Sequence, residues 1–170
     1  MSLKIAICPG SFDPVTHGHL DIVTRASKMF DRVIVAVMTN PSKDPKFTTN
    51  ERMALLRKAT AQLPNVEIDC FDGLLVNFAR KKSATVIIKG LRALSDFEYE
   101  FQMALTNRKL GPEIETVFLT TLAENMYLSS SIVKQVACFG GDISDFVPAC
   151  ILEEIKERLC IQQEDKKNEQ

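Results

Sequence analysis

The sequence predicts an α/β fold, namely a single-domain, doubly wound (Rossmann-like) five-stranded parallel sheet with helices on both faces and further helices at the C-terminal end. Five apolar runs rich in β-branched residues recur along the chain, with helical patterns between them. Their near-continuous hydrophobicity is typical of strands that are covered on both faces. A chain of 170 residues with 45% apolar composition is also long enough for one domain with a full core.

The predicted elements alternate along the first 120 residues. Apolar residues at helical spacing predict a helix after the first strand, and residues 48–51 form a capping box that opens a second helix. A short helix is expected over 74–82 and a longer one from Ser95. The first strand is expected to break at Pro9. The apolar runs themselves predict strands at 3–8, 32–38, 66–70, 85–90 and 115–119.

Composition limits the classes of function. The domain is expected to span 1–161, whereas 162–170 lacks apolar anchors and is expected to be a polar, disordered tail. A net charge of −1 gives no basic footprint for nucleic acid, and no apolar run has the length of a membrane span. The five scattered cysteines form no metal-ligand cluster, so neither a protein-held metal nor a disulfide framework is expected. Cys8 and Cys70 are expected to be buried, and the location to be the reducing cytoplasm.

Ligands of open α/β sheets bind beyond the carboxyl ends of the strands, where the strand order switches. The segment CPGSFDPVTHGH follows the first predicted strand and holds both histidines of the chain. Unpaired N–H groups at a helix N-terminus favour an anion, and imidazoles there can donate to phosphoryl oxygens. We expect His19 to stabilise charge during a displacement at phosphorus, with Ser11 nearby. His17 is either a second ligand contact or an ordinary helix-start side chain.

The segments after the second and fourth strands carry cations. Lys43 lies in the Pro-rich loop 39–47 and is expected to bind an anionic group, whereas Lys46 is expected to be solvated. Lys89 ends the fourth strand, and Arg92 can clamp a phosphate by two parallel hydrogen bonds. The basic run 80–82 is expected to be a solvated helix face.

A third group of polar residues precedes the C-terminal helices. Three successive serines, 129–131, offer hydroxyls and free N–H groups to a polyphosphate. Capping of the helix would need only one of them. Lys134 lies one helical turn further on, facing either the same anion or solvent.

Together, the HxGH segment, the lysine loop, KGLRALSDFEYE (89–100) and LSSSIVK (128–134) resemble the nucleotidylyltransferase superfamily of the HxGH type. Within it they are similar to the bacterial phosphopantetheine adenylyltransferase family, from about residue 4 to residue 150. This resemblance implies transfer of the adenylyl group of ATP to 4'-phosphopantetheine, which gives dephospho-coenzyme A and pyrophosphate in coenzyme A biosynthesis. It also implies Mg²⁺ with the ATP, and a homohexamer.

The resemblance further implies roles for individual residues. Lys89 stands where some members have Arg, so it keeps the charge that would contact the substrate but lacks the planar guanidinium. Asn125 stands where others have Trp, so we expect backbone contacts there in place of an aromatic one. The catalytic residues would be His19, Lys43 and Arg92. The substrate phosphopantetheine would contact Ser11, Lys43, Leu75 and Lys89. ATP would contact Ser11, Phe12, His19, Gly90, Leu91, Arg92, Glu100, Asn125, Met126, Tyr127, Leu128, Ser129, Ser130 and Ser131.

The chemistry fits the absence of any carboxylate dyad or Ser/His/Asp set in the sequence. The nucleophile would be a phosphate oxygen that is already anionic, so positioning and charge stabilisation suffice without a covalent intermediate. Three other functions share some of these features. They are a cytidylyltransferase acting on a sugar or polyol phosphate, an aminoacyl-tRNA synthetase, and a nucleotide sensor without catalysis.

Overall fold

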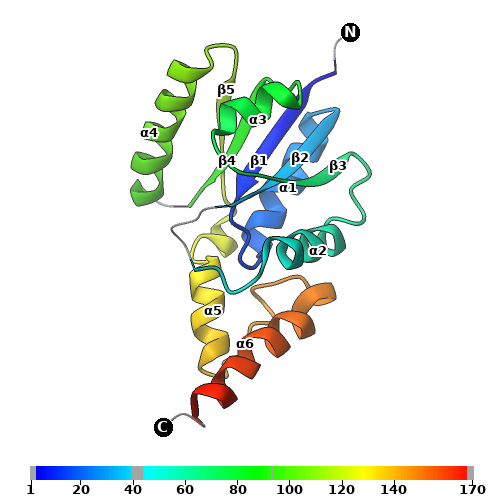
Figure 1. Cartoon of the computed structure of the whole chain (residues 1–170), viewed down its shortest axis with the longest axis vertical. Coiled ribbons are helices and arrows are strands. Elements are labelled where there is room, and N and C mark those ends of the chain that lie inside the picture. Colours follow the sequence, from blue (N-terminus) through cyan, green and yellow to red (C-terminus); the bar gives the residue numbers. More distant parts are fainter. Residues whose placement is uncertain (1–2, 40–43, 93, 168–170) are drawn as a thin grey trace.

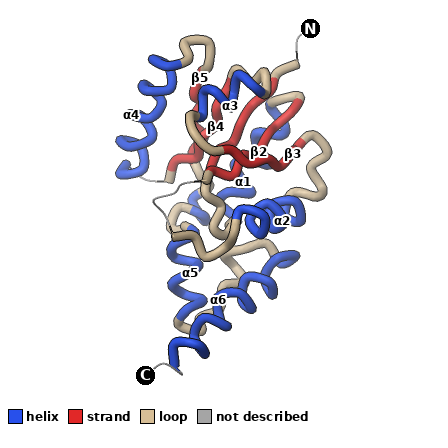
Figure 2. Tube along the Cα trace, viewed as in Figure 1, coloured by secondary structure: helices blue, strands red, loops and turns tan. Residues whose placement is uncertain are grey.

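The computed structural model describes residues 3–39, 44–92 and 94–167, and it confirms the predicted fold class (Figures 1 and 2). A five-stranded sheet has the order β3-β2-β1-β4-β5, and every neighbouring pair is parallel. The expected strands lie within three residues of the observed ones at each end. The strands are β1 (Ile5–Gly10), β2 (Arg32–Met38), β3 (Val66–Phe71), β4 (Val86–Leu91) and β5 (Glu115–Thr120).

Helices connect and cover the strands. Thr48 and Glu51 form the predicted capping box at the start of the second helix. The last two long helices extend away from the sheet at one end of the molecule (Figure 1). The helices are α1 (His17–Met29), α2 (Thr49–Ala59), α3 (Leu75–Lys81), α4 (Leu94–Leu110), η1 (Ala123–Asn125), α5 (Ser130–Cys138), η2 (Ala149–Ile151) and α6 (Leu152–Lys167).

The side chains of β1 alternate between two hydrophobic clusters, as the two-residue period of a strand requires. Ala6 and Cys8 face a large cluster formed with α1, α2, α5 and α6. Ile5 and Ile7 face a smaller cluster to which α3 contributes. Because both faces of the central strands are covered, these strands read as continuous apolar runs in the sequence.

The sheet opens at its carboxyl edge between β1 and β4. β1 pairs with β2 along its whole length, from Ile5 to Gly10, but it pairs with β4 only at Ala6 and Ile7. The expected break at Pro9 is therefore wrong, because Pro9 continues the strand opposite Ala36. Pairing with β4 has already ended there, so the missing N–H of proline interrupts no pairing on that side. This opening is the switch point at which a ligand is expected.

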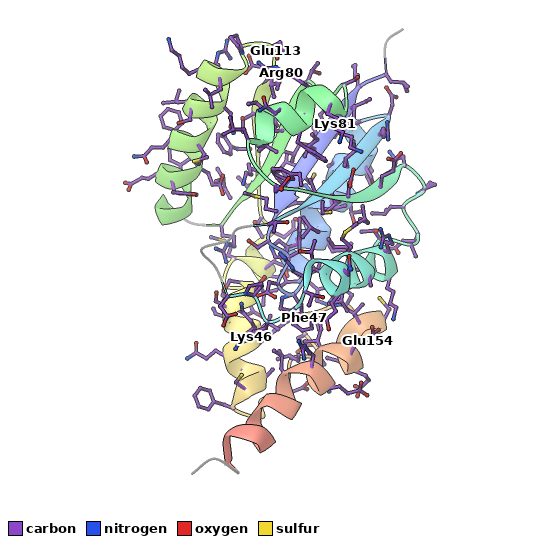
Figure 3. All side chains as sticks on the ribbon, viewed as in Figure 1. Lys46, Phe47, Arg80, Lys81, Glu113 and Glu154 are labelled. Carbon is purple, nitrogen blue, oxygen red and sulfur yellow. The ribbon has the colours of Figure 1, made fainter. Side chains whose placement is uncertain are left out.

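Three expectations about individual segments have different outcomes. Cys70 is exposed, not buried, because β3 is an edge strand, whereas Cys8 is buried in the centre. α6 continues to Lys167, into the segment that the sequence predicts as a tail. Arg80 is exposed and forms an ion pair with Glu113 at the surface, as expected for a solvated helix face. This pair lies far from the part of the molecule that carries Lys46 and Phe47 (Figure 3). Across the described ranges, no helix has the length and apolarity needed to cross a membrane.

Candidate active site

A cavity of about 1210 Å³ lies at the carboxyl edge of the sheet. The N-terminal ends of α1 and α5 both reach it, with Gly18 and His19 from one and Ser130 and Ser131 from the other. Unpaired backbone N–H groups at two helix ends give this part of the wall a positive potential. The cavity is therefore suited to a polyanion.

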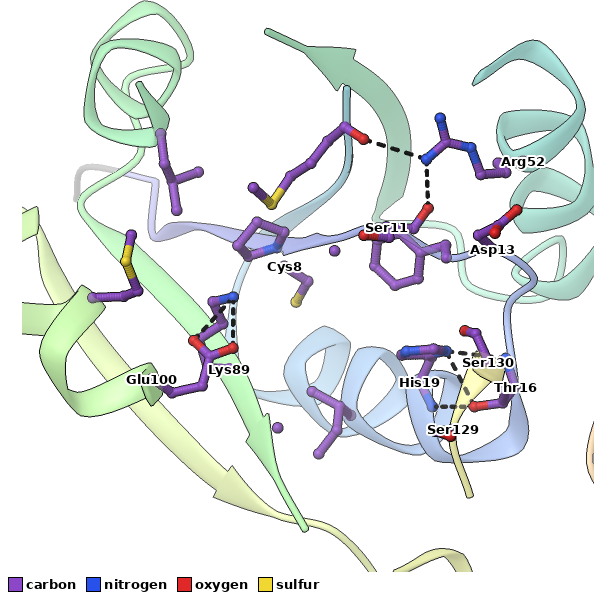
Figure 4. Close-up of a pocket in the computed structure, with 18 of the residues that line it drawn as sticks. Cys8, Ser11, Asp13, Thr16, His19, Arg52, Lys89, Glu100, Ser129 and Ser130 are labelled. Atoms are coloured by element: carbon purple, nitrogen blue, oxygen red, sulfur yellow. Dashed lines mark hydrogen bonds and ion pairs between the residues drawn. The ribbon is translucent and has the colours of Figure 1, made fainter. Parts of the chain in front are cut away.

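His19 is held by the cap of its own helix. The N-cap residue is Thr16, whose side chain accepts from the backbone N–H of His19, while the backbone N–H of Thr16 donates to Nδ1 of the imidazole at 3.1 Å (Figure 4). Histidine here takes the place of the Glu or Gln of an ordinary capping box. Because Nδ1 accepts a hydrogen bond from an amide, the proton of the neutral imidazole lies on Nε2. The cap thus fixes both the orientation and the tautomer of His19.

The same position keeps His19 neutral. Burial and, to a smaller extent, the nearby charge of Arg92 together lower the pKa of the imidazole from 6.5 to about 4. At neutral pH the side chain therefore offers one N–H donor, from Nε2, without carrying a net charge. Such a donor can stabilise negative charge that develops on a phosphoryl oxygen.

The aromatic ring of Phe12 packs against the imidazole of His19. The φ of Phe12 is +49°, a value that bulky residues rarely adopt, and its ring meets the imidazole edge-on at 5.1 Å between centroids. Gly10 makes this conformation possible, because a Cβ at that position would lie 2.9 Å from the Phe12 ring. The aromatic side chain is buried, so it packs against the catalytic candidate.

Asp13 joins three segments that are distant in sequence. Its carboxylate accepts from the backbone N–H groups of Lys46 (3.2 Å) and Phe47 (2.9 Å), and it forms an ion pair with Lys134 of α5 (2.7 Å). The residue is only 5% exposed. The loop after β1, the loop before α2 and helix α5 are consequently fixed relative to one another around the cavity.

The comparisons with known proteins agree on the family. The family model "Cytidylyltransferase-like" matches residues 7–136. The chain is 59% identical over 156 residues to a phosphopantetheine adenylyltransferase of Alkaliphilus metalliredigens, covering 92% of this chain and 99% of that protein. It is 56% identical to one of Caldanaerobacter subterraneus, with 92% and 98% covered. The chain belongs to the phosphopantetheine adenylyltransferase family.

Solved structures support the fold of this phosphopantetheine adenylyltransferase family member at lower identity. One neighbour, from Vibrio parahaemolyticus, is described as a "Putative Nicotinate-nucleotide Adenylyltransferase"; it has a TM-score of 0.64 and 19% identity, with 92% of this chain and 96% of that chain covered. A lipopolysaccharide core biosynthesis protein from Thermoplasma volcanium has a TM-score of 0.54 and 22% identity, with 71% and 99% covered. The family membership therefore comes from sequence, and these structures bear on the fold alone.

Most of the residues that the resemblance to phosphopantetheine adenylyltransferases singles out meet at the cavity. Lys43 lies outside the described residues. Leu91, Asn125, Met126 and Tyr127 are not among the lining residues. The predicted residues that do line it are Ser11, Phe12, His19, Leu75, Lys89, Gly90, Arg92, Glu100, Leu128, Ser129, Ser130 and Ser131.

The residues that miss the cavity have structural positions elsewhere. Asn125 is buried in η1 and packs against Gly18 of α1. A Cβ added to Gly18 would lie 3.7 Å from the Cβ of Asn125. Tyr127 packs edge-on against Phe146. Both line a second, smaller cavity of about 540 Å³ together with His17. His17 is therefore separated from the site of His19.

The three serines divide their roles. Ser129 is the N-cap of α5 and accepts from the backbone N–H of Ile132, and the Ser130 hydroxyl donates to the Pro14 carbonyl at 2.7 Å. The Ser131 side chain is exposed and makes no hydrogen bond within the described part of the chain. One serine thus caps the helix, one joins it to the loop after β1, and one hydroxyl stays available to a ligand.

The β4 side of the cavity is polar and pre-organised. Lys89 lies 3.1–3.2 Å from the two carboxylate oxygens of Glu100 on α4. Arg92 donates to the Leu128 carbonyl at 2.6 Å, which links the end of β4 to the start of α5. Gly90 is required by packing, because a Cβ there would lie 2.8 Å from Ile22 of α1. Burial raises the pKa of the Cys8 thiol to about 12, although the nearby charge of Lys89 acts in the opposite direction. Cys8 lines the cavity but stays a neutral thiol, so it cannot act as a thiolate nucleophile.

Two residues of the wall were not singled out from the sequence. Thr16 is the cap that orients His19, and a threonine three residues before a histidine at a helix start is the signal that could have indicated it. Arg52 is buried and shares the covered face of α2 with Leu55, Leu56 and Ala59. A charged residue at helical spacing among apolar ones was the available signal for Arg52.

Proposed function

We propose that the protein transfers the adenylyl group of ATP to 4'-phosphopantetheine. A phosphate oxygen of the acceptor attacks the α-phosphorus of ATP, and the bond from this phosphorus to the bridging oxygen of pyrophosphate breaks. Dephospho-coenzyme A and pyrophosphate result. The observation that carries the proposal is the neutral, capped His19 between two helix N-termini, supported by the names of the relatives.

His19 is assigned to the α-phosphoryl group. Its Nε2 proton would donate to a nonbridging oxygen as charge builds up there, and free backbone N–H groups in the first turns of α1 and α5 would hold the rest of the triphosphate. Arg92 supplies a permanent charge beside it and holds the carbonyl of Leu128. The nucleophile is an anion already, so no side chain has to remove a proton from it.

The acceptor is assigned to the part of the cavity beside Ser11, Leu75 and Lys89, which are among its lining residues. Lys43, in the loop 39–47, is assigned to the same set as a cation. Lys89 is paired with Glu100, so on acceptor binding Lys89 would exchange the Glu100 carboxylate for the acceptor phosphate. The proposal also includes ATP contacts at Gly90, Glu100 and Leu128, which line the cavity, and at Leu91 and 125–127, which adjoin lining residues in the sequence.

Mg²⁺ would accompany ATP. The ion is commonly held by substrate phosphates and waters with few protein ligands. The Ser131 hydroxyl and the free N–H groups at the start of α5 fit this arrangement, because they can order phosphate oxygens without competing for the metal. The bound ion would offset part of the negative charge of the triphosphate.

The assembly is proposed to be a homohexamer in the cytoplasm. Helix α4 leaves Phe97 (40%), Phe101 (44%) and Leu105 (54%) exposed, and Phe97 stacks on Phe101. At their spacing of four residues these side chains share one face of the helix, and an exposed apolar face is typical of subunit contacts. The cysteines Cys8, Cys70, Cys138 and Cys150 are free, as suits a reducing compartment.

The proposed reaction is tested by pyrophosphate release with ATP, 4'-phosphopantetheine and Mg²⁺, omitting each in turn and replacing ATP by CTP. We expect release only with the complete ATP mixture, and dephospho-coenzyme A as the second product. Release with CTP and a sugar phosphate would overturn the assignment, as would ATP binding without release. His19→Ala should lower kcat by at least about 100-fold with little change in the KM for ATP.

A further inference from the structure

Arg52 is a buried cation without a carboxylate partner. The residue is 4% exposed and lines the cavity. Its guanidinium donates to the carbonyl oxygens of Ser11 (2.8 Å) and Met38 (3.3 Å) and to the Thr49 hydroxyl (3.1 Å), and its Nε has no partner. Within the described ranges it forms no ion pair. A buried charge that lacks a counter-charge is costly, so its presence calls for an explanation.

The neighbouring carboxylates do not neutralise it. Asp13, two residues after Ser11, is engaged by Lys134. Glu51, the preceding residue on α2, caps its helix by accepting from the Thr48 N–H and faces Arg158. Asp44 lines the cavity but is exposed and makes no ion pair in the described parts of the chain. Among the described residues, no carboxylate therefore pairs with Arg52.

The position of Arg52 indicates which group this is. Its partner Ser11 is one of the proposed acceptor contacts (Figure 4). Its partner Met38 ends β2 directly before the loop 39–47, which holds Lys43. The α-phosphoryl side is served by His19, Arg92 and the start of α5. A phosphate monoester bound next to Ser11 would lie in the field of the buried guanidinium, which is screened little by salt.

We propose that Arg52 is a positioning and specificity residue of the acceptor subsite: it holds the Ser11 turn against the end of β2, and its fixed charge selects an acceptor that carries a phosphate. This role rests on the proposed function, because it uses the assignment of that end of the cavity to phosphopantetheine. Its electrostatic part does not depend on turnover.

The first test separates charge from hydrogen bonding by comparing Arg52→Lys with Arg52→Gln. Both lose the planar fork, but only Lys keeps the charge. We expect Arg52→Gln to raise the KM for phosphopantetheine by about 10- to 100-fold and the KM for ATP by less than about 3-fold, with Arg52→Lys recovering most of the loss. Equal losses in the two variants, or equal effects on both substrates, would overturn the charge role.

The second test needs no turnover and uses Thr49, the first residue of α2, which touches the guanidinium. Thr49→Asp places a carboxylate beside Arg52, and Thr49→Asn is its uncharged control. Without ligands, we expect Thr49→Asp to unfold at a higher temperature than Thr49→Asn in the natural background, and Arg52→Gln to reduce this advantage to the part that the dipole of α2 supplies. An unchanged advantage would show that Arg52 is already compensated.

The two tests fail in different ways. If the protein with its natural sequence binds neither ATP nor phosphopantetheine by calorimetry, the proposed function fails, while the thermal comparison still reports on the charge of Arg52. If it binds both and releases pyrophosphate, but Arg52→Gln binds phosphopantetheine as tightly as before, the specificity role alone is refuted.

Discussion

Titration of His19 offers a quantitative check of its environment. The folded state lowers the pKa of the imidazole from 6.5 to about 4, mainly through burial. Below pH 6.5 the unfolded chain therefore binds a proton that the folded protein does not, so this residue makes the protein less stable as the pH falls towards 4. Above that window it contributes no pH dependence.

The size of the effect follows from the two pKa values. At pH 5 the unfolded imidazole is almost fully protonated and the folded one almost fully neutral, which lowers the free energy of unfolding by about 2 kcal/mol relative to pH 8. Carboxylates also titrate in this range, so the effect has to be measured as a difference. His19→Asn is a suitable reference, because its amide oxygen can take the place of Nδ1 as acceptor for the Thr16 N–H.

The assay is urea denaturation of both proteins at pH 8, 7, 6 and 5. We expect the natural sequence to lose about 2 kcal/mol more than His19→Asn between pH 8 and pH 5. In a His17→Asn background, where His19 is the one remaining histidine, its imidazole NMR signals should stay unchanged above pH 5. Parallel pH profiles for the two proteins, or an imidazole that titrates near pH 6.5, would refute the buried, neutral state.

Three further predictions concern the rest of the site. Lys43→Ala should raise the KM for phosphopantetheine with little effect on ATP, and equal turnover at low acceptor concentration would contradict its role. Asp13→Asn removes the charge that binds Lys134 and the two backbone N–H groups of the loop. It should lower the free energy of unfolding by about 3 kcal/mol and weaken acceptor binding. An unchanged midpoint of urea denaturation would contradict the role of these contacts. Phe101→Glu on the apolar face of α4 should dissociate the oligomer in sedimentation experiments, whereas a natural protein that sediments as a monomer would refute the assembly.

The fold was predictable because its strands carry a local signal. Central strands covered on both sides, such as β1 and β2, are apolar at every position and stand out in the sequence. The start of α2 was predictable for a similar reason, since the capping box of Thr48 and Glu51 needs only four consecutive residues. Edge position is not a local property, and so Cys70 in β3 was wrongly expected to be buried.

The site was predictable as a set of loops, but not as a set of contacts. His19 and the three serines follow local rules for helix ends. The pairing of Asp13 with Lys134 spans 121 positions, and the burial of Arg52 depends on how α2 packs on the end of β2, so neither follows from spacing. The resemblance points to 125–131 as one stretch; in the structure 128–131 line the large cavity, and Asn125 and Tyr127 line the smaller one.

The most direct measurement is a crystal structure with 4'-phosphopantetheine and an ATP analogue whose α,β-bridge cannot be cleaved. We expect the α-phosphorus between the starts of α1 and α5, with Nε2 of His19 within hydrogen-bond distance of one of its oxygens and the acceptor phosphate on the Ser11 side. Adenosine bound outside this cavity, or an imidazole turned away from phosphorus, would contradict the assignment of the site.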